Sequence, residues 1–345
     1  MRKKIKWIVL TLTVLILGTV FYFGYHIFTF AGDIYVGDDP DDHKFFSPAN
    51  PTENPPPPKW EGTERVNILL LGADARDDGA PGRADTIMVA SIDPVSKNTY
   101  LFSILRDTYV EIGNRGKDRI NAALVYGGPN LAMRTVSELM GIPIQYYIYT
   151  DFRGFEALVD SVNGVEIDVE KDMYYYDSYD DYEINLKEGL QVLDGEKALQ
   201  YVRFRHDKLG DYTRTERQRN LLNALAQKMQ KTTSLIRLPS ILQSVEPYIE
   251  TNISRNNLIK LAALGFEAKT SDMVTEQIPP MSLLRETTIN GAQVILADED
   301  DLHQYIEELF IQHEQEPEED TEPEPNSIPG SSSSTPNPNN QPSAR

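Results

Sequence analysis

Several residue types that carry common protein chemistry are missing or scarce. Among 345 residues there is no cysteine, and the five histidines show no His-Glu-x-x-His spacing. Disulfides, cysteine-bound zinc, iron–sulfur clusters and thiol catalysis are therefore excluded, and any bound metal should be a hard cation with oxygen ligands. Positive charge is also in deficit, because 33 Lys and Arg face 53 Asp and Glu, a formal net charge of −20. This balance argues against a nucleic-acid-binding surface, which needs a cationic footprint.

One long apolar run stands at the N-terminus. Residues 7–30 contain no Asp, Glu, Lys or Arg over 24 positions. As a helix they extend about 36 Å, more than the ~30 Å hydrocarbon core of a bilayer. Four basic residues precede the run and acidic residues follow it, so residues 1–6 are predicted to be cytoplasmic and the chain after the run extracellular. A cleaved signal peptide would have a shorter apolar region of about 7–15 residues. We therefore expect residues 7–30 to be an uncleaved signal-anchor in the cell membrane.

Composition separates a folded domain from its flanks. Residues 31–64 are acidic and contain four consecutive prolines, which predicts a stiff linker. Residues 312–345 are acidic and then rich in Ser, Pro and Asn, which predicts a disordered tail. The extracellular domain is accordingly expected over residues 65–311.

Strand and helix patterns mix within residues 65–311 without strict alternation. Apolar or alternating runs predict strands at 66–71, 86–92, 99–105, 145–150, 165–169 and 273–278. Helical spacing predicts helices at 129–140, 152–162, 194–201, 213–230, 255–268 and 298–310. A capping box, Thr213 with Glu216, opens the fourth of these helices. We therefore expect an α/β fold in which a mixed β-sheet is sandwiched between helices (α/β/α).

The first three predicted strands bring charged residues to one edge of the sheet. The loop between the first two strands is too short for a crossover helix, so these strands should be antiparallel if they are neighbours. Asp74 then follows the first strand and Asp85 begins the second at the same edge, where the third strand ends at Arg106. Two carboxylates beside arginines suit Mg²⁺ bound to a phosphate. The alternative is a polar hairpin loop whose Asp residues form turns.

A second group of arginines lies between residues 201 and 219. In an extended stretch Arg203 and Arg205 would point the same way. In the following helix Arg214 and Gln218 fall on the buried stripe, with Arg217 beside it. Arginines at a helix N-terminus oppose the helix dipole unless an anion binds there, and their planar forks match phosphate. The alternative is a surface helix whose arginines pair with nearby acidic residues.

The stretch 172–183 is unusual because it holds five Tyr and five acidic residues. We expect an exposed insert or rim loop rather than a catalytic element. Contact with carbohydrate is the alternative for this stretch, since aromatic rings stack on sugar faces.

Five motifs in this chain resemble those of the LytR–CpsA–Psr family, in the family's order and spacing. The motifs are Asn67–Arg76, Gly82–Thr86, Ser103–Thr108, Arg119–Ala123 and Tyr201–Gln218. The resemblance covers about residues 66–230 and is weak over about 231–311. It implies an α/β/α sandwich with an apolar groove or tunnel for a polyprenyl tail.

The resemblance further implies a bacterial cell-envelope phosphotransferase that acts at the membrane. Such enzymes move a glycopolymer, for example wall teichoic acid, from an undecaprenyl-pyrophosphate carrier to peptidoglycan with Mg²⁺ (or Mn²⁺). By position, the metal ligands would be Asp74 and Asp85. The pyrophosphate-binding set would be Arg76, Arg83, Arg106, Arg119, Asn121, Arg203, Arg205, Arg214, Arg217 and Gln218. The catalytic set would be Asp211, Arg106, Arg203 and Arg214, with Asp211 acting as a base or orienting an arginine.

Two other functions stay open at this point. One is a regulator that binds a polyprenyl pyrophosphate without catalysis, which the Asp74 and Asp85 pair argues against because a lipid binder needs no metal ligands. The other is a pyrophosphatase that uses the same residues with water as nucleophile. The sequence does not distinguish this hydrolase from the transferase, and it leaves the donor glycopolymer open.

Overall fold

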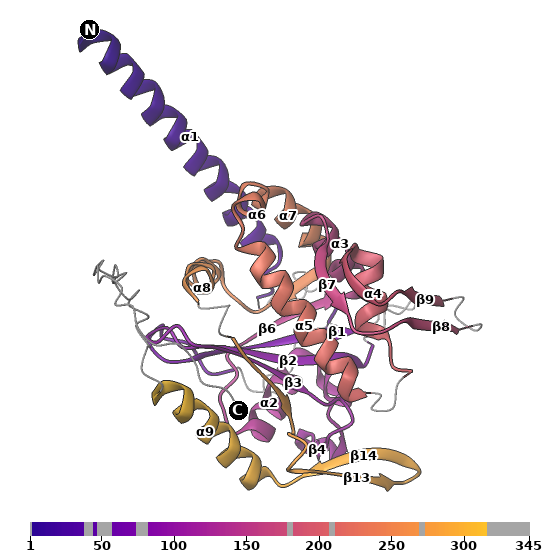
Figure 1. Ribbon diagram of the computed structural model, residues 1–345. Coiled ribbons are helices and arrows are strands. Elements are labelled where there is room, and N and C mark those ends of the chain that lie inside the picture. Colours follow the sequence, from indigo (N-terminus) through magenta and orange to yellow (C-terminus); the bar gives the residue numbers. More distant parts are fainter. Residues whose placement is uncertain are drawn as a thin grey trace, which may run out of the picture. The chain divides into compact units, whose positions relative to one another are not determined.

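Figure 1 shows the computed structural model, which describes residues 2–37, 44–46, 57–73, 82–177, 182–206, 211–268 and 273–315. The helices are α1 (Arg2–Asp33), α2 (Ala122–Met140), α3 (Phe152–Ser161), α4 (Gly195–Arg203), α5 (Asp211–Met229), α6 (Thr232–Ile236), α7 (Leu238–Val245), α8 (Arg255–Glu267) and α9 (Glu299–Gln315). The strands are β1 (Val66–Ala73), β2 (Ala84–Ile92), β3 (Thr99–Ile104), β4 (Tyr109–Glu111), β5 (Lys117–Arg119), β6 (Tyr146–Asp151), β7 (Val165–Val169), β8 (Met173–Asp177), β9 (Tyr182–Leu186), β10 (Gly189–Leu193), β11 (Ile249–Thr251), β12 (Val274–Ile278), β13 (Leu284–Ile289) and β14 (Ala292–Ala297).

The central sheet contains six strands in the order β11-β6-β1-β2-β3-β12. β1 pairs antiparallel with β2, and β2 with β3, as their short connections predict. β6 runs parallel to β1 and β12 runs parallel to β3, whereas β11 is antiparallel to β6. The sheet is therefore mixed, which confirms that part of the predicted fold class.

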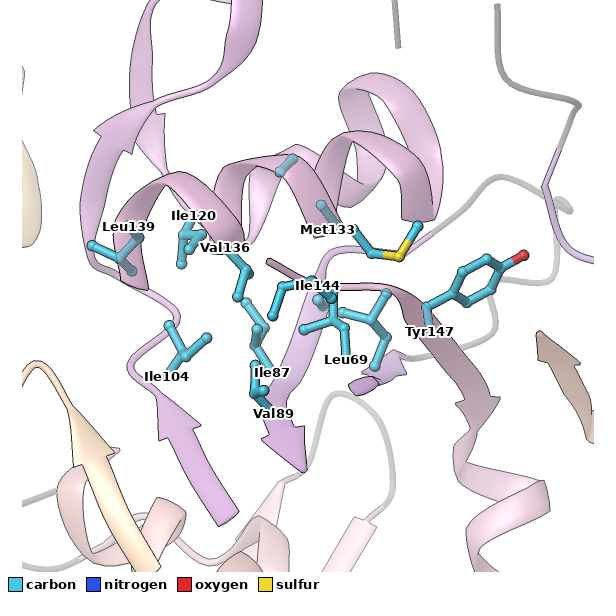
Figure 2. Packing of buried hydrophobic residues seen from close by; sticks show 14 of the residues in the cluster. Leu69, Ile87, Val89, Ile104, Ile120, Met133, Val136, Leu139, Ile144 and Tyr147 are labelled. Atoms are coloured by element: carbon cyan, nitrogen blue, oxygen red, sulfur yellow. The ribbon is translucent and has the colours of Figure 1, made fainter. Parts of the chain in front are cut away.

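Helices cover both faces of this sheet. Because side chains alternate along a strand, Leu69 of β1 packs in one buried cluster with α2 and α9, and Ile68 packs in another with α8. Figure 2 shows the first face, where Met133 and Val136 of α2 lie near Leu69 and other sheet residues. The predicted α/β/α sandwich is confirmed.

A further buried cluster joins α3, α4 and α5 to the small sheet of β7 and β10. Val159, Leu199 and Leu221 are members from the three helices. The side chains of Asp151 and Asp194 cap α3 and α4 by accepting hydrogen bonds from backbone amides three residues on. This cluster holds the helices that form one wall of the site described below.

Two helix boundaries differ from the sequence prediction near the arginine motifs. α5 begins at Asp211, so Thr213 lies inside the helix and is not its N-cap. α4 continues to Arg203, because Tyr201 and Val202 are buried in the cluster of α3, α4 and α5. The predicted extended arrangement of Arg203 and Arg205 is therefore wrong, since Arg203 ends a helix and only the next residues are non-helical.

Further differences are at α2, at α9 and in elements that the sequence analysis did not predict, among them α6, α7, β10 and β11. α2 begins at Ala122 rather than at 129, because a kink at Gly127 and Gly128 joins a short segment to the predicted helix. α9 reaches Gln315, so the first residues of the predicted tail are helical, and residues 316–345 lie outside the described residues. The sequence missed the β4–β5 and β13–β14 hairpins.

The Tyr-rich stretch forms the β8–β9 hairpin rather than a loop. Tyr174 and Tyr176 are exposed on one face of β8, whereas Tyr175 packs against the cluster of α3, α4 and α5. Residues 178–181 lie outside the described residues. One face of the hairpin is thus exposed, as predicted for this stretch, and its other face packs against the core.

Parts of the predicted linker 31–64 pack on the domain. The Val36 amide donates to the Thr251 carbonyl at 2.9 Å, and the Phe45 amide donates to Glu250 Oε2 at 2.8 Å. Phe46 and Trp60 are buried in clusters on opposite faces of the sheet. The folded unit therefore includes described residues that precede position 65.

A chain that starts at residue 62 should be clearly less stable than one that starts at Ile34. It lacks Val36, Phe46 and Trp60, and deleting a buried aromatic side chain costs about 3–5 kcal/mol. Urea unfolding followed by circular dichroism measures the difference between the two. Equal unfolding midpoints would show that the segment before residue 62 adds nothing to the domain.

Candidate active site

Asp85 and Arg106 meet at the edge of the sheet where β2 begins and β3 ends. The β1–β2 ladder pairs Gly72 with Thr86 and Ala73 with Ala84, so Asp85 lies at an irregularity between these pairs. Arg106 Nη1 donates a hydrogen bond to Asp85 Oδ1. Asp85 and Arg106 are therefore neighbours, as the antiparallel pairing of these strands predicts.

Asp107 links Arg106 to Arg119 of β5. Arg119 Nη1 donates to Asp107 Oδ1 at 3.1 Å, and Arg106 Nε lies 3.7 Å from Asp107 Oδ2. The amide of the buried residue Asn121 donates to the Arg106 carbonyl at 3.3 Å. The structure thus brings Arg106, Arg119 and Asn121 together, as the resemblance implies.

A neighbouring charge cluster surrounds Asp118 of β5. Tyr126 Oη donates to Asp118 Oδ2 at 2.5 Å, and the Arg119 amide donates to Oδ1 at 2.7 Å. Burial acts to raise the pKa of Asp118, but these hydrogen bonds and the charges of Arg83 and Arg119 hold it below its ordinary value. The exposed side chain of Arg83 therefore adds its charge next to the Arg106 and Arg119 group.

The N-terminal half of α5 supplies two inward side chains to the same edge. Arg214, which is 4% exposed, donates from Nη2 to the Asp85 carbonyl at 3.3 Å. One turn later Gln218 Nε2 donates to Thr86 Oγ1 at 3.1 Å. Both residues face inward, as the helical projection predicts.

Arg203 and Arg205 approach this group from the end of α4. The Arg203 guanidinium lies 5.0 Å from the ring centroid of Phe152 and 4.3 Å from that of Tyr182. These two cation–π contacts fix its position at the helix end. Burial raises the pKa of Tyr182, and the charge of Arg203 acts in the opposite direction. Arg205 is exposed, so it presents its charge to solvent.

Arg217 lies apart from the anion-binding candidates and has a different environment. Its Nε donates to Glu170 Oε1 at 2.7 Å, and its Nη1 donates to the Phe204 carbonyl at 2.8 Å. Its side chain is 3% exposed. Arg217 therefore does not lie with the other predicted pyrophosphate-binding residues. Its hydrogen bonds hold the segment after α4 in place instead.

Replacing Arg217 should lower stability rather than remove a ligand contact. In Arg217→Ala the buried Phe204 carbonyl loses its donor, which costs about 1–3 kcal/mol. Glu170→Gln should cost much less, because Glu170 is 45% exposed and can bind water instead. Thermal unfolding of both variants measures this. If the Arg217→Ala protein kept its stability but lost its affinity for the lipid donor, Arg217 would be a pyrophosphate-binding residue after all.

A cavity of about 420 Å³ lies between the sheet, α3, α5 and α7. Its charged lining consists of Asp85, Asp151, Arg203, Arg205 and Arg214. Its apolar lining includes Leu70, Met88, Ile148, Phe155, Leu158, Leu221, Leu222, Leu225, Val245 and Ile249. Along α5 the lining changes from Arg214 and Gln218 to leucines over three turns, about 16 Å at 1.5 Å per residue. The cavity therefore has a charged end and an apolar end.

Sequence reasoning missed Asp151, which lines the cavity. Asp151 is 1% exposed and accepts from the Gly154 amide at 2.9 Å and from Arg153 Nη2 at 2.7 Å. The parallel ladder pairs Asp151 with Ala73, at the edge where β1 ends. An Asp directly after a predicted strand and before a predicted helix was the available signal, but the pairing of β6 with β1 is not local in sequence.

Three predicted site residues are only partly described or not described. Asp74 and Arg76 lie outside the described residues, which resume at Gly82. Asp211 is the first residue of α5, so its backbone lies one turn before Arg214. The proposed roles of these three residues stay predictions.

The described residues contain no group of three or more His, Asp and Glu side chains that could hold a metal ion. Asp85 nevertheless has the ligand chemistry of Mg²⁺, which needs only one or two carboxylates beside waters and phosphate oxygens. Asp74 directly follows Ala73, the last residue of β1, in the sequence, and Ala73 pairs with Ala84, the neighbour of Asp85. The donor chemistry of Asp85 therefore fits a magnesium ion, and the part of Asp74 as a second ligand stays a prediction, because Asp74 lies outside the described residues.

The sequence and the fold are similar to those of known proteins. The sequence matches the LytR_cpsA_psr family over residues 36–311, most of the chain. The chain therefore belongs to the LytR–CpsA–Psr family.

Particular members of the family are similar over long segments. The polyisoprenyl-teichoic acid–peptidoglycan teichoic acid transferase TagU of Enterococcus faecalis is 35% identical over 250 residues, 71% of this chain and 79% of TagU. Regulatory protein MsrR of Staphylococcus aureus is 36% identical over 198 residues, 57% of this chain and 59% of MsrR. The crystal structure of Bacillus subtilis TagV aligns with a TM-score of 0.60 at 28% identity, covering 71% of this chain and 97% of that structure.

Proposed function

We propose that this chain is a phosphotransferase that moves a teichoic acid or similar glycopolymer from an undecaprenyl-pyrophosphate carrier to peptidoglycan. The observation that carries the proposal is the cavity, which has apolar walls and several arginines at one end. Such a cavity fits an amphiphile with an anionic head and a long apolar tail. The transferase name of the similar Enterococcus faecalis protein supports the class of reaction.

The apolar part of the cavity suits a polyprenyl chain. Leu158 of α3, Leu222 of α5 and Val245 of α7 line it. Enclosing such a chain would stabilise the complex by about 0.8 kcal/mol for each buried CH₂ group. α7 also contacts α1, the helix that we propose as the membrane anchor, so a lipid tail has a short path from the bilayer.

The charged end suits a pyrophosphate. Arg203, Arg205 and Arg214 line it, and Arg106 stands next to Asp85. Guanidinium groups bind phosphate oxygens with two parallel hydrogen bonds, which orients the head group. Phosphoryl transfer requires mainly such positioning and neutralisation of charge.

The proposed metal site uses Asp85 and Asp74. A bound Mg²⁺ would neutralise charge on the pyrophosphate oxygens. The hydrogen bond from Arg106 orients the Asp85 carboxylate, which lines the charged end of the cavity. Asp211 is the proposed base for the acceptor hydroxyl, or alternatively a residue that orients an arginine.

The membrane topology completes the proposal. The segment Lys4–Asp33 of α1 has the length and hydropathy of a membrane span, and its most apolar stretch is not buried by the protein. Positive residues before it favour a cytoplasmic N-terminus and an extracellular domain. An extracellular domain meets both substrates, since peptidoglycan lies outside the cell membrane.

The test is a transfer assay with the full chain in detergent, a defined lipid-linked glycopolymer, purified glycan strands and Mg²⁺. We expect a glycan-linked polymer and a released polyprenyl phosphate in equal amounts. Release of polyprenyl phosphate without linkage to glycan would indicate a pyrophosphatase. Binding of the donor without turnover would indicate a regulator, the description carried by MsrR.

The arginine nearest to Asp85 on α5 gives a specific prediction for donor binding. Arg214→Ala should weaken polyprenyl pyrophosphate binding by about 1.5–3 kcal/mol, the range for hydrogen bonds to charged groups. Arg214→Lys should restore only part of the lost binding free energy, because lysine lacks the planar fork of the guanidinium group. Calorimetry with a soluble donor analogue measures the affinities, and Arg237→Ala, on the surface before α7, is the control. Unchanged affinity in Arg214→Ala would put the anion site elsewhere.

A further inference from the structure

Helix α8 has apolar residues on two opposite faces. Leu258, Leu261 and Leu264 pack toward the sheet. On the other side Ile259, Ala262, Ala263 and Phe266 are exposed and follow the spacing i, i+3, i+4, i+7, which is a continuous stripe on a helix. Ile259 is 46% exposed and Phe266 is 60% exposed. The described part of the chain places no other element over this stripe.

The stripe begins beside the membrane-anchor helix. The Arg255 guanidinium, at the N-terminal end of α8, lies 4.8 Å from the ring centroid of Phe28 in α1. The backbone of α1 passes so close that a Cβ atom at Gly32 would overlap the Arg255 side chain. Figure 1 shows α6, α7 and α8 around the C-terminal end of α1. The N-terminal end of α8, one turn before the stripe, thus packs against the C-terminal end of α1.

The segment that contains α6, α7 and α8 is rich in positive charge, although the chain as a whole is strongly negative. The cations of the segment 228–267 are Lys228, Lys231, Arg237, Arg255 and Lys260. None of these five has a carboxylate partner among the described residues. The three acidic residues of the segment are already engaged: Glu246 with Lys44, Glu250 with backbone amides, and Glu267 with Lys97. Ile236 adds an exposed apolar side chain, 67% exposed, at the end of α6.

We propose that α8 and the α6–α7 corner form a membrane-contacting face that rests in the headgroup layer of an anionic bilayer. The proposal requires α1 to be a membrane anchor. Apolar residues flanked by Lys and Arg, at the level where a membrane helix ends, match the chemistry of an amphipathic helix that lies in the interface. A protein partner would not explain why the helix that carries the stripe begins against the C-terminal end of α1.

This face orients the domain on the membrane. α7 lies in it and also contributes Val245 to the apolar wall of the cavity. Docking the face would therefore hold the apolar part of the cavity near the bilayer and keep the arginine end farther out. A tether alone would leave the domain free to rotate about the end of α1.

Site-specific fluorescence quenching tests the proposal on the full chain. Because the chain has no cysteine, single variants Ile259→Cys and Phe266→Cys can carry a fluorophore in vesicles of phosphatidylcholine and phosphatidylglycerol. Lipids with a nitroxide on the headgroup act as quenchers. Met281→Cys is the matched control, since Met281 is 61% exposed and lies three residues before β13, which is away from α1. Leu15→Cys, in the middle of α1, reports whether the anchor is inserted.

We expect labels at Ile259 and Phe266 to be quenched strongly, and the label at Met281 to be quenched little. Arg237→Gln and Lys260→Gln should each lower the ratio of docked to undocked domain about fivefold on the anionic vesicles, the effect of one Lys or Arg near such a surface. Quenching at Ile259 and Phe266 no stronger than at Met281, with Leu15 deep in the bilayer, would overturn the proposal. A Leu15 label outside the bilayer would overturn it together with the anchor, and unchanged ratios in both glutamine variants would contradict the role of charge.

Discussion

Replacing Asp85 with alanine should abolish transfer and leave the fold intact. Asp85 is the described carboxylate at the charged end of the cavity that fits a metal ligand, and it also accepts from Arg106. Losing one such preorganised charge in an active site costs about 100-fold or more in rate. Its side chain is 33% exposed, so the effect on stability should stay within about 1 kcal/mol. The transfer assay and thermal unfolding measure the two quantities.

A matched variant separates the site from general charge effects. Asp168→Asn removes an exposed carboxylate on β7, which does not line the cavity, and should retain full transfer. Asp85→Asn should behave like Asp85→Ala if metal binding requires the negative charge. Raising the Mg²⁺ concentration should rescue Asp85→Asn partly and Asp85→Ala less. Equal Mg²⁺-dependent transfer by the Asp85→Ala protein and the unaltered chain would remove Asp85 as a ligand.

A carboxylate placed in the apolar wall should separate long-chain from short-chain donors. Leu222 of α5 lines the cavity one helical turn beyond Gln218, where the lining has become apolar. In Leu222→Glu a polyprenyl chain would have to desolvate the new carboxylate, at a cost of about 3 kcal/mol or about 100-fold in affinity. A donor analogue with a short chain does not reach this wall and should bind almost normally.

The ratio of the two affinities is the informative quantity. A fall in the affinity for both donors alike would indicate damage to the fold rather than loss of a tail contact. Leu190→Glu is the control, because Leu190 is 69% exposed on β10 and lies outside the cavity lining. A Leu222→Glu protein that keeps its preference for long-chain donors would mean that the tail binds elsewhere.

The parts of the site that sequence reasoning predicted depend on local geometry. Asp85 and Arg106 belong to strands joined by short loops, and short loops between neighbouring strands force antiparallel pairing. Arg214 and Gln218 share a helix face with Leu221 and Leu225, so helical periodicity alone turns them inward. In each case a few adjacent residues determine the outcome.

The parts that were missed depend on contacts between distant segments. Asp151 reaches the cavity because β6 pairs in parallel with β1, and the sequence between them does not specify that neighbour. Arg217 lies next to the buried stripe of α5, yet its direction follows from Glu170 of a segment 47 residues earlier. Phe45 and Phe46 of the predicted linker pack on Tyr149, a contact that composition does not reveal.

One cavity should bind both the head and the tail of a polyprenyl-pyrophosphate donor. Photo-crosslinking tests this most directly, with a donor that carries a diazirine at the far part of its polyprenyl chain and the full chain in detergent. Mass spectrometry of the crosslinked peptides should locate the label on the α3, α5 and α7 wall, at residues such as Leu158, Leu222 and Val245. The yield should fall in Arg214→Ala, because the head group would no longer be held. Crosslinks that avoid this wall, or that are unaffected by Arg214→Ala, would contradict the claim.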